Sequence, residues 1–533
     1  MRIYKSRYAC PDLPALSIFD FLFDEGSKAA SASPEMVALV DGLTGKKVTY
    51  AALRRSSLLF ASGLSTVCGS FQTSTILLLS RSSIHYPNVV LAASAARLSV
   101  SLADPAATVY ELVVQLKASG AGVLIVEAEH GILTKALEAA RKVGLTKERV
   151  VIMPSAVSGT RLTDEELGER GFKTTKILTD AQQPFESVVL TEEEVKNDLA
   201  CAFYQTLLAG EPKLTHISPY NVTSQLLQVV QMPGIFIPGE TRLMAVPMAY
   251  ALGLFIELYL SIHLGCTLVV YPSFLRSPFW LESKSTARRS TLVIVGPLVP
   301  LFIHDPLLEK YDLSSLRWIA SGGSAIPSSA QHALTRRMNA LRCTSSASST
   351  LFPATKPFAF LQAGGMTETT CICFLPAIEE AASGKVGESV GELVAGFEAR
   401  VVRYDVGKGG EGREVVSDVK DGEEGELWLR GASVSKGYLP DALATGTTVT
   451  PDGWLRTGDL VRRSPAGLFT YTGRLKPLIK NKGLQVNPVQ VEHLIHSTGL
   501  VQDCAVVGVW SNKFLTELPR ALGSFYPLMS LFR

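Results

Sequence analysis

Apolar runs without polar alternation recur along the first half of this chain, and amphipathic segments separate them. The runs that we expect to form strands are 74–80, 122–127, 149–153, 291–296 and 316–323. The segments that we expect to form helices are 86–98, 110–119 and 133–143. Continuous apolar strands interleaved with helices indicate parallel β-α-β units whose sheets are covered on both faces. The pattern therefore predicts an α/β fold built on doubly wound sheets.

One stretch, residues 244–272, is apolar enough to be mistaken for a membrane span. It is interrupted by Pro247, Gly253 and Glu257, and it ends in a β-branched run. A charged residue at the centre of a bilayer costs roughly 2.5–3.5 kcal/mol on insertion scales. We therefore expect a buried helix followed by a buried strand.

Charge and cysteine content exclude several classes of partner. The chain has 51 basic and 49 acidic residues, so there is no electrostatic case for nucleic acid or an anionic membrane as the main partner. Eight cysteines are scattered without a C-x-x-C pair, which favours a reducing compartment over a zinc site or a disulfide framework. The N-terminal residues also lack the apolar core of a signal peptide. We expect an intracellular protein, cytoplasmic by default.

The amino-acid composition of the chain changes twice after residue 340. Residues 341–357 are rich in Ser, Thr and Ala without periodicity, and we interpret them as an insertion. From 384 to 473 the chain is Gly-rich with short alternating runs, which predicts a subdomain of antiparallel β-hairpins. A helix at 487–499 and a strand at 504–510 then begin a small α+β unit.

Three Gly-bounded motifs follow one another in the last third of the chain. They are "GEEGELWLRGASVSKGYL" (422–439), "DGWLRTGDL" (452–460) and "GRLKPLIKNKGLQVNPVQVE" (473–492). Each motif alone is typical of the turns of β-hairpins. Together, in this order and spacing, they resemble the adenylate-forming (AMP-binding) superfamily and, within it, the 4-coumarate–CoA ligase-like acyl-CoA synthetases. The resemblance implies a large AMP-binding domain at 1–473 and a small C-terminal lid domain at 474–533.

The reaction that this resemblance implies has two steps. A carboxylate attacks the α-phosphate of ATP to give acyl-AMP and pyrophosphate, and the sulfur of coenzyme A then displaces AMP. The implied cofactors are ATP, Mg²⁺ and coenzyme A, and the implied substrate is an aryl or medium- to long-chain carboxylic acid. The first step needs neutralised phosphate charge and an aligned nucleophile, and the family rotates its small domain between the steps. A role in a biosynthetic, secondary-metabolite pathway rests on analogy alone.

The C-terminal motifs imply contacts with ribose and phosphate. Asp459 is similar to the aspartate that accepts both ribose hydroxyls, since a carboxylate can take two such hydrogen bonds. Arg474 resembles the arginine that also reaches the ribose, and Lys476 stands at the hinge position. Lys480 and Gln485 match catalytic positions that meet the phosphate in one domain orientation or the other.

Glycines and a Thr-Glu pair supply the other implied contacts. "LQAGGMTETT" resembles the motif in which Thr367 holds the α-phosphate and Glu368 binds Mg²⁺, a hard ion that takes few protein ligands. The glycines that match nucleotide-contacting or CoA-contacting positions are Gly322, Gly323, Gly364, Gly365 and Gly483. The family usually has an aromatic residue at the position of Gly364, where it stacks on adenine, so that stacking face is missing here.

The acyl pocket and the phosphate loop both depart from the family pattern. Tyr250 and Gly323 match positions that line the acid pocket, although a core tyrosine is an equally good interpretation of Tyr250. In the loop, Gly210 and Lys213 match, but the preceding Ser/Thr/Gly run has become Gln-Thr-Leu-Leu-Ala at 205–209. Losing one preorganised donor to a charged transition state can cost roughly 2.7–4 kcal/mol. We therefore expect impaired pyrophosphate chemistry, whereas the same losses need not remove AMP or acyl-AMP binding.

The end of the chain is the other departure. The family continues for several dozen residues after "LPRAL" and there carries a lysine that contacts the carboxylate and the α-phosphate, whereas this chain ends in "GSFYPLMSLFR". We expect an incomplete lid domain and no Ser-Lys-Leu-type peroxisomal address, although relatives include peroxisomal proteins. Three interpretations are open: an active acyl-CoA ligase, a relative that binds nucleotide or acyl-adenylate without turnover, and a mis-spliced gene model. Transcript sequence would separate the third from the others.

Overall fold

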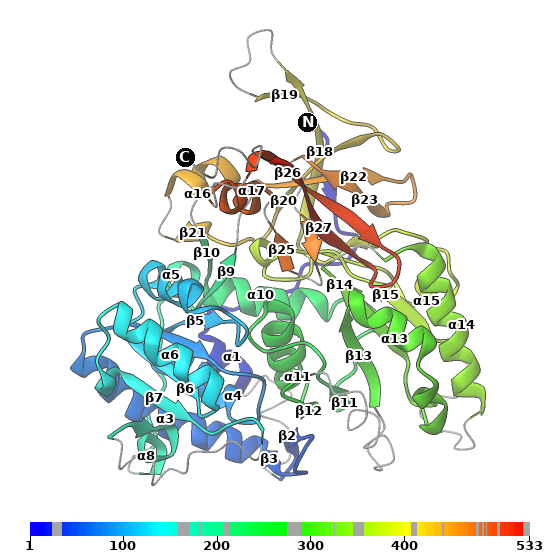
Figure 1. The fold of residues 1–533 in the computed structure, drawn as a ribbon. Coiled ribbons are helices and arrows are strands. Elements are labelled where there is room, and N and C mark those ends of the chain that lie inside the picture. The colour runs from blue at the N-terminus through cyan, green and yellow to red at the C-terminus, as the bar shows by residue number, and fades with distance from the viewer. Residues whose placement is uncertain are drawn as a thin grey trace.

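Two sheets with parallel cores form the lower part of the molecule (Figure 1). The computed structural model describes residues 1–533 except 24–34, 158–170, 181–182, 206–212, 274–288, 324–325, 345–356, 407–412, 440–441, 476–478, 482–483, 487, 498–500 and 526–533. The first sheet has the strand order β21-β10-β9-β5-β4-β6-β7-β8, and the second has the order β15-β14-β13-β11-β12-β2-β3. The predicted α/β class is confirmed.

The first sheet follows the predicted alternation of strands and helices. Its parallel strands are β4 (Thr75–Leu79), β5 (Ser99–Ala103), β6 (Val123–Glu127), β7 (Val150–Met153) and β8 (Lys173–Thr174). Helices α3 (Tyr50–Ser70), α4 (Tyr86–Ala95), α5 (Val109–Ser119) and α6 (His130–Lys142) connect or cover them. The remaining strands are β9 (Cys201–Gln205), parallel to β5, and β10 (Lys213–Ile217) and β21 (Tyr438–Leu439), which continue the sheet antiparallel.

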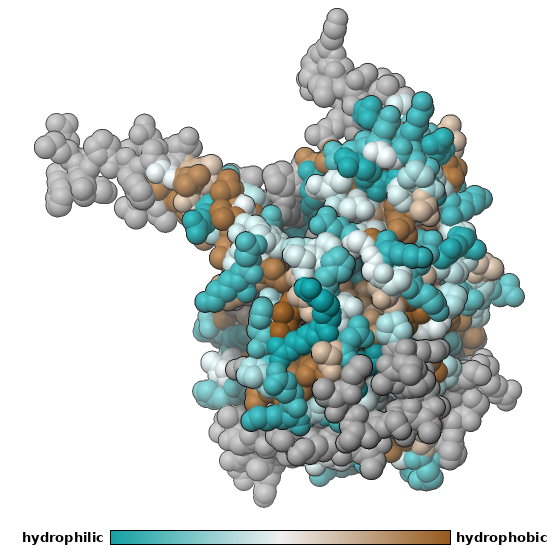
Figure 2. All heavy atoms as spheres, turned by 90° about the vertical axis from the view of Figure 1, so that its right-hand side faces the viewer, coloured by the Kyte–Doolittle hydropathy of each residue, from teal (hydrophilic) through white to brown (hydrophobic). Residues whose placement is uncertain are grey.

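The second sheet contains the predicted strands near residues 290 and 320. Its strands are β2 (Val37–Asp41), β3 (Lys47–Thr49), β11 (Thr241–Leu243), β12 (Thr267–Val270), β13 (Arg289–Val295), β14 (Trp318–Gly322) and β15 (Ala359–Gln362). The pairs from β2 through β15 are parallel, and only β3 joins its neighbour antiparallel. Helices α13 (Val299–His304), α14 (Ser328–Thr344) and α15 (Ile378–Ala382) lie at one side, where hydrophilic side chains cover much of the surface (Figure 2).

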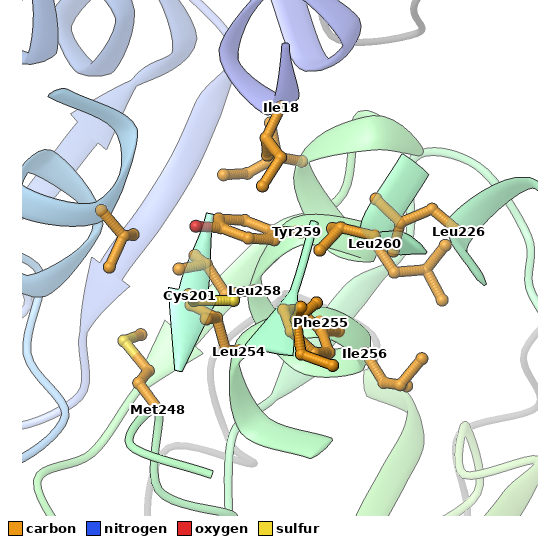
Figure 3. Packing of buried hydrophobic residues seen from close by; sticks show 14 of the residues in the cluster. Ile18, Cys201, Leu226, Met248, Leu254, Phe255, Ile256, Leu258, Tyr259 and Leu260 are labelled. Atoms are coloured by element: carbon orange, nitrogen blue, oxygen red, sulfur yellow. The ribbon is translucent and has the colours of Figure 1, made fainter. Parts of the chain in front are cut away.

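The apolar stretch at 244–272 is a buried helix and a buried strand, as predicted. It forms η2 (Leu252–Tyr259), a π-helix, then α11 (Leu260–His263) and β12. Within the described ranges no helix is long and apolar enough to cross a membrane. In Figure 3, Leu254 and Tyr259 of η2 surround the same small cavity as Ile18 of α1 (Ile18–Phe23) and Cys201 of β9. The helix thus belongs to a core cluster that also contains residues of both sheets.

A buried ion pair ties η2 to the second sheet. Arg242 Nη2 lies 3.3 Å from Glu257 Oε1, and both side chains are at most 3% exposed. Arg242 Nη1 also donates to the carbonyl of Ile256 at 2.9 Å and to Ser261 Oγ at 3.0 Å. Burial raises the pKa of Glu257 to about 7, against the opposing charge of Arg242. The carboxyl group therefore holds its proton more strongly in the folded chain than in the unfolded one.

We predict that Glu257→Gln removes part of the pH dependence of stability. Because the folded pKa is raised, the wild-type free energy of unfolding should fall as pH rises from about 4.5 through about 7, by up to about 3 kcal/mol. The variant stays neutral, so it should match the wild type near pH 5 and exceed it at pH 8. Urea unfolding of both proteins at the two pH values measures this difference. Parallel pH profiles for the two proteins would contradict the prediction.

A third sheet and a small C-terminal unit complete the fold. The third sheet is antiparallel and contains β1 (Tyr4–Lys5), β18 (Glu398–Val406), β19 (Arg413–Asp418), β20 (Glu424–Arg430), β22 (Leu455–Arg463) and β23 (Phe469–Arg474). This is the predicted hairpin subdomain. The C-terminal unit contains β24 (Ile479–Asn481), β25 (Leu484–Val486), α17 (Pro488–Ser497), β26 (Val501–Ser511) and β27 (Thr516–Phe525).

The interpretation of residues 341–357 as an insertion needs one correction. Helix α14 continues to Thr344, so the first four residues of this stretch are helical. The absence of apolar periodicity was misleading here, because a helix end that carries polar and small residues keeps its backbone hydrogen bonds without an apolar face. Residues 345–356 lie outside the described part of the chain.

Candidate functional site

The carboxyl ends of β14 and β15 bring two pairs of predicted glycines together. The strands are parallel, with Ser321 opposite Gln362, and the Ala363 N–H donates to the Ser321 carbonyl at 2.8 Å. Gly323 follows β14 with φ +80°, a conformation that favours glycine. Ligands of open parallel sheets bind outside the carboxyl ends of the strands. Gly322 and Gly323 therefore lie at the edge where such a ligand is expected.

Gly364 and Gly365 begin the turn that follows β15, and the turn leaves no room for larger residues. A Cβ on Gly364 would lie 3.1 Å from Val390 and 3.2 Å from Phe374, so these side chains fill the space next to the missing aromatic group. A Cβ on Gly365 would lie 1.6 Å from the Cys371 carbonyl oxygen. Gly365 is thus required by the close approach of the backbone, whatever else it contacts.

The end of this turn is strained and is held by buried hydrogen bonds. Thr370 and Cys371 have φ of 55° and 113°, which non-glycine residues rarely adopt. Thr370 Oγ1 donates to the Ser433 carbonyl at 2.6 Å, and the Ile372 N–H donates to Gln225 Oε1 at 3.0 Å. Strain of this kind persists where the surroundings over-determine it, and it clusters at functional sites. Ser433 and Gln225, which accept these hydrogen bonds, were not predicted from the sequence.

Glu368 lies within this turn and meets a tyrosine that the sequence analysis also missed. Glu368 is 3% exposed in the short helix η6 (Thr367–Thr369). Tyr438 Oη donates to Glu368 Oε1 at 2.6 Å, and Lys213 Nζ lies 5.4 Å from the centre of the Tyr438 ring. The pairing of β10 with β21 places Tyr438 opposite Thr215, two residues from Lys213. Lys213 and Glu368 thus contact the same aromatic side chain.

Asp459 and Arg474 form an ion pair across adjacent strands. They are directly opposite in the register of β22 and β23, and Arg474 Nε lies 2.6 Å from Asp459 Oδ1. The exposed fractions of the two side chains are 17% for Arg474 and 9% for Asp459. The pair is therefore largely withdrawn from water. Charge-assisted hydrogen bonds are stronger in such a buried environment than in solvent. The two residues that the family resemblance assigns to the ribose thus lie side by side, and their contact with a ribose stays a prediction.

Lys480 approaches the same ion pair from the C-terminal unit. Burial and the charge of Arg474 lower the pKa of Lys480, while Asp459 and Glu517 oppose that shift. The Lys480 N–H donates to Glu517 Oε2 at 2.6 Å, and Thr516 Oγ1 donates to the Lys480 carbonyl at 2.7 Å. Strand β27 therefore fixes the backbone of β24, and Lys480 reaches the surroundings of Asp459 from there.

Tyr250 is not a core tyrosine. Its side chain is 38% exposed, and its hydroxyl donates to Asp104 Oδ2. Burial of the ring and the hydrogen bond with Asp104 raise the pKa of Tyr250. Asp104 follows the carboxyl end of β5, so this contact joins the first sheet to the start of η2. That Tyr250 lines an acid pocket stays a prediction.

Several predicted site residues cannot be placed. Gly210, Lys476 and Gly483 lie outside the described residues, and of Gln485 only the backbone position in β25 is described. Leu214, which stands where the family has a glycine after the lysine, is fully buried and pairs with Leu439. Its side chain therefore belongs to the interior of the protein.

Most of the chain is similar to known proteins. Residues 27–439 match the family model described as AMP-binding enzyme. The chain belongs to this AMP-binding family. It is 28% identical over 510 residues to 4-coumarate–CoA ligase-like 4 of Oryza sativa subsp. japonica, covering 95% of this chain and 84% of that protein. It is 26% identical over 515 residues to peroxisomal OPC-8:0-CoA ligase 1 of Arabidopsis thaliana, covering 96% and 84%.

Solved structures confirm the adenylate-forming fold. A long-chain-fatty-acid-CoA ligase from Archaeoglobus fulgidus aligns with a TM-score of 0.72 at 19% identity, covering 98% of this chain and 93% of that one. An amide bond synthetase from Marinactinospora thermotolerans aligns with a TM-score of 0.75 at 20% identity, covering 96% and 90%. The family expected from the three C-terminal motifs is confirmed, and these likenesses concern the fold alone.

Proposed function

We propose that this AMP-binding family member activates a carboxylic acid with ATP to an acyl-adenylate and transfers the acyl group to coenzyme A. The observation that carries the proposal is the convergence on Tyr438. Its hydroxyl donates to Glu368, and its ring lies beside Lys213. Burial raises the pKa of Tyr438, and the charge of Arg474, which is paired with Asp459, opposes that shift. Carboxylates and cations gathered at one buried place suit a ligand with both hydroxyl and phosphate groups.

The nucleotide would be held by groups on different sheets. We assign Asp459 to the ribose hydroxyls, with Arg474 fixing its carboxylate and reaching the ribose. Lys213 and Thr367 would bind the phosphates, and the glycines at the ends of β14 and β15 would border adenine and the acyl group. Preorganised donors that face developing charge lower the barrier to attack on the α-phosphate. Tyr250 would bound the acid on the side of the first sheet.

Glu368 is the residue that fits Mg²⁺. Among the described residues, no group of three or more His, Cys, Asp or Glu side chains could hold a metal by itself. Mg²⁺ suits such a site, because it is commonly bound by one or two carboxylates together with substrate phosphates. When bound, the ion would neutralise phosphate charge during adenylation. Glu368 supplies the protein oxygen and holds it at a buried, hydrogen-bonded position.

The thioester step would use the C-terminal unit. We assign Lys480 and Gln485 to the phosphate end of the nucleotide in one orientation of this unit, Lys476 to its hinge, and Gly483 to the path of the pantetheine arm. The position of Lys480 near Asp459 and Arg474 supports its part in this assignment. A lid that turns between two half-reactions presents different faces to one site.

A second candidate function is binding of nucleotide or acyl-adenylate without turnover. The observation that favours it is the sequence Gln-Thr-Leu-Leu-Ala at 205–209, where the family has a Ser/Thr/Gly run. Apolar side chains offer the phosphates no donors, and losing one preorganised donor to a charged transition state can cost roughly 2.7–4 kcal/mol. Such a loss slows adenylation without removing the groups assigned to the ribose.

Pyrophosphate release decides between the two candidates. We expect the purified chain with Mg·ATP to release pyrophosphate with at least one acid from a panel of aryl and fatty acids, and to form the thioester when coenzyme A is added. Glu368→Gln should lower the release rate at least about 100-fold, as removal of one charge-stabilising group does elsewhere. AMP binding without release by the wild type would support the second candidate. Failure to bind AMP or ATP would reject both.

A further inference from the structure

Tyr438 lies beside two charged groups of the site. Its hydroxyl donates to Glu368 Oε1 at 2.6 Å, and Lys213 Nζ lies 5.4 Å from its ring centre. The hydroxyl therefore serves Glu368 as a hydrogen-bond donor.

The main chain fixes where this side chain starts. Tyr438 pairs with Thr215 of β10, and its N–H donates to Thr445 Oγ1 at 2.9 Å. Gly437 precedes it with φ +111°, and a Cβ there would lie 2.3 Å from Thr445 Cγ2. Glycine is favoured at position 437 because of this positive φ and the close contact with Thr445. Strand pairing and the threonine contact thus fix the backbone from which the Tyr438 ring extends.

We propose that Tyr438 is a positioning residue that orients the Glu368 carboxylate for the divalent cation. The proposal rests on the proposed function, in which Glu368 binds Mg²⁺. Glu368 is 3% exposed, so little water is present to replace a lost donor. Carboxylates that bind metals are themselves hydrogen-bonded, and loss of such an outer partner typically costs about 10–100-fold in metal affinity.

The test is Tyr438→Phe, which removes the hydroxyl and keeps the ring beside Lys213. We would titrate ATP into the full chain by calorimetry at a series of Mg²⁺ concentrations, and AMP without metal. The Mg²⁺ concentration that gives half-maximal ATP affinity should rise roughly 10-fold. The metal-free Kd for AMP should stay within about twofold, because ribose contacts do not involve this hydroxyl. Thr445→Val, which removes the acceptor for the Tyr438 N–H, should shift the Mg²⁺ requirement the same way by less.

Tyr4→Phe is the matched control. Tyr4 Oη donates to Asp421 Oδ1 at 2.9 Å, a tyrosine–carboxylate bond in the third sheet outside the site, and its loss should leave the Mg²⁺ requirement unchanged. An unchanged Mg²⁺ requirement in Tyr438→Phe would overturn the proposal. Equal weakening of ATP and AMP would also overturn it, since that result indicates a structural role only. If wild type binds AMP and never ATP, the proposed Mg²⁺ site fails first and the positioning role fails with it.

Discussion

Replacing Asp459 with alanine should raise the Kd for AMP at least about 100-fold. A carboxylate that accepts both ribose hydroxyls makes two charge-assisted hydrogen bonds, and each contributes about 1.5–3 kcal/mol. Their loss corresponds to about 3–6 kcal/mol, and every 1.4 kcal/mol is a factor of about ten in affinity. The substitution also leaves Arg474, 17% exposed, without the carboxylate that lies 2.6 Å from its Nε. Calorimetric titration with AMP measures the effect.

Asp421→Asn provides the control for this experiment. Asp421 accepts from Arg463 Nη1 at 2.9 Å, so the variant removes the carboxylate charge of another Arg–Asp pair, whose arginine is on strand β22. Its AMP affinity should equal that of the wild type, which separates the loss of a particular carboxylate from general damage to the third sheet. Equal AMP affinity in wild type and Asp459→Ala would refute the assignment of Asp459 to the ribose.

The elements of the fold could be predicted because each kind of sheet leaves its own pattern. Strand β6 is apolar at each position but its last and is covered on both faces, whereas β22 alternates between buried and exposed residues. Those patterns follow from burial on two faces or on one. The end of helix α14 was interpreted as part of an insertion because its last turn, ending at Thr344, carries polar residues that resemble a loop in composition.

The site was predictable where neighbours in space are held by a short hairpin. Asp459 and Arg474 belong to adjacent motifs, and the antiparallel register of β22 and β23 puts them opposite each other. Tyr438 was missed because its partner Glu368 is 70 residues away, and tertiary contacts bring the two together, such as the Ser435 N–H that donates to the Glu368 carbonyl at 2.8 Å. The motif "SKGYL" contained the tyrosine, but no spacing within it indicates a carboxylate partner.

Backbone geometry was the other feature that the sequence could not reveal. Gly365 reads as one of two glycines in a nucleotide-contacting motif. The structure shows a steric reason for this glycine. The carbonyl oxygen of Cys371, in the turn where Thr370 and Cys371 have positive φ, lies too close to Gly365 for any side chain there. Two non-glycine residues with positive φ are not expected from composition, since such conformations cost about 1–3 kcal/mol each.

Gly365→Ala should therefore lower the free energy of unfolding by about 3 kcal/mol or more. The added Cβ would lie 1.6 Å from the Cys371 carbonyl oxygen. Either the backbone at Gly365 or the strained backbone at Cys371 must therefore move. Movement of the turn would also displace Glu368, which is buried within it. Urea unfolding measures the first effect, and ATP binding at saturating Mg²⁺ measures the second.

Gly69→Ala separates this steric effect from the general consequence of replacing a glycine. Gly69 lies in the last turn of α3, and a Cβ there would meet nothing within 4 Å. Alanine at such a helical position should stabilise the chain by about 0.4–1 kcal/mol, because it restricts the unfolded state. Opposite signs for the two Gly→Ala variants would identify the Cys371 carbonyl as the cause of the destabilisation. A stable Gly365→Ala variant that binds ATP normally would show that the turn relaxes without strain, and Glu368 would then not depend on its geometry.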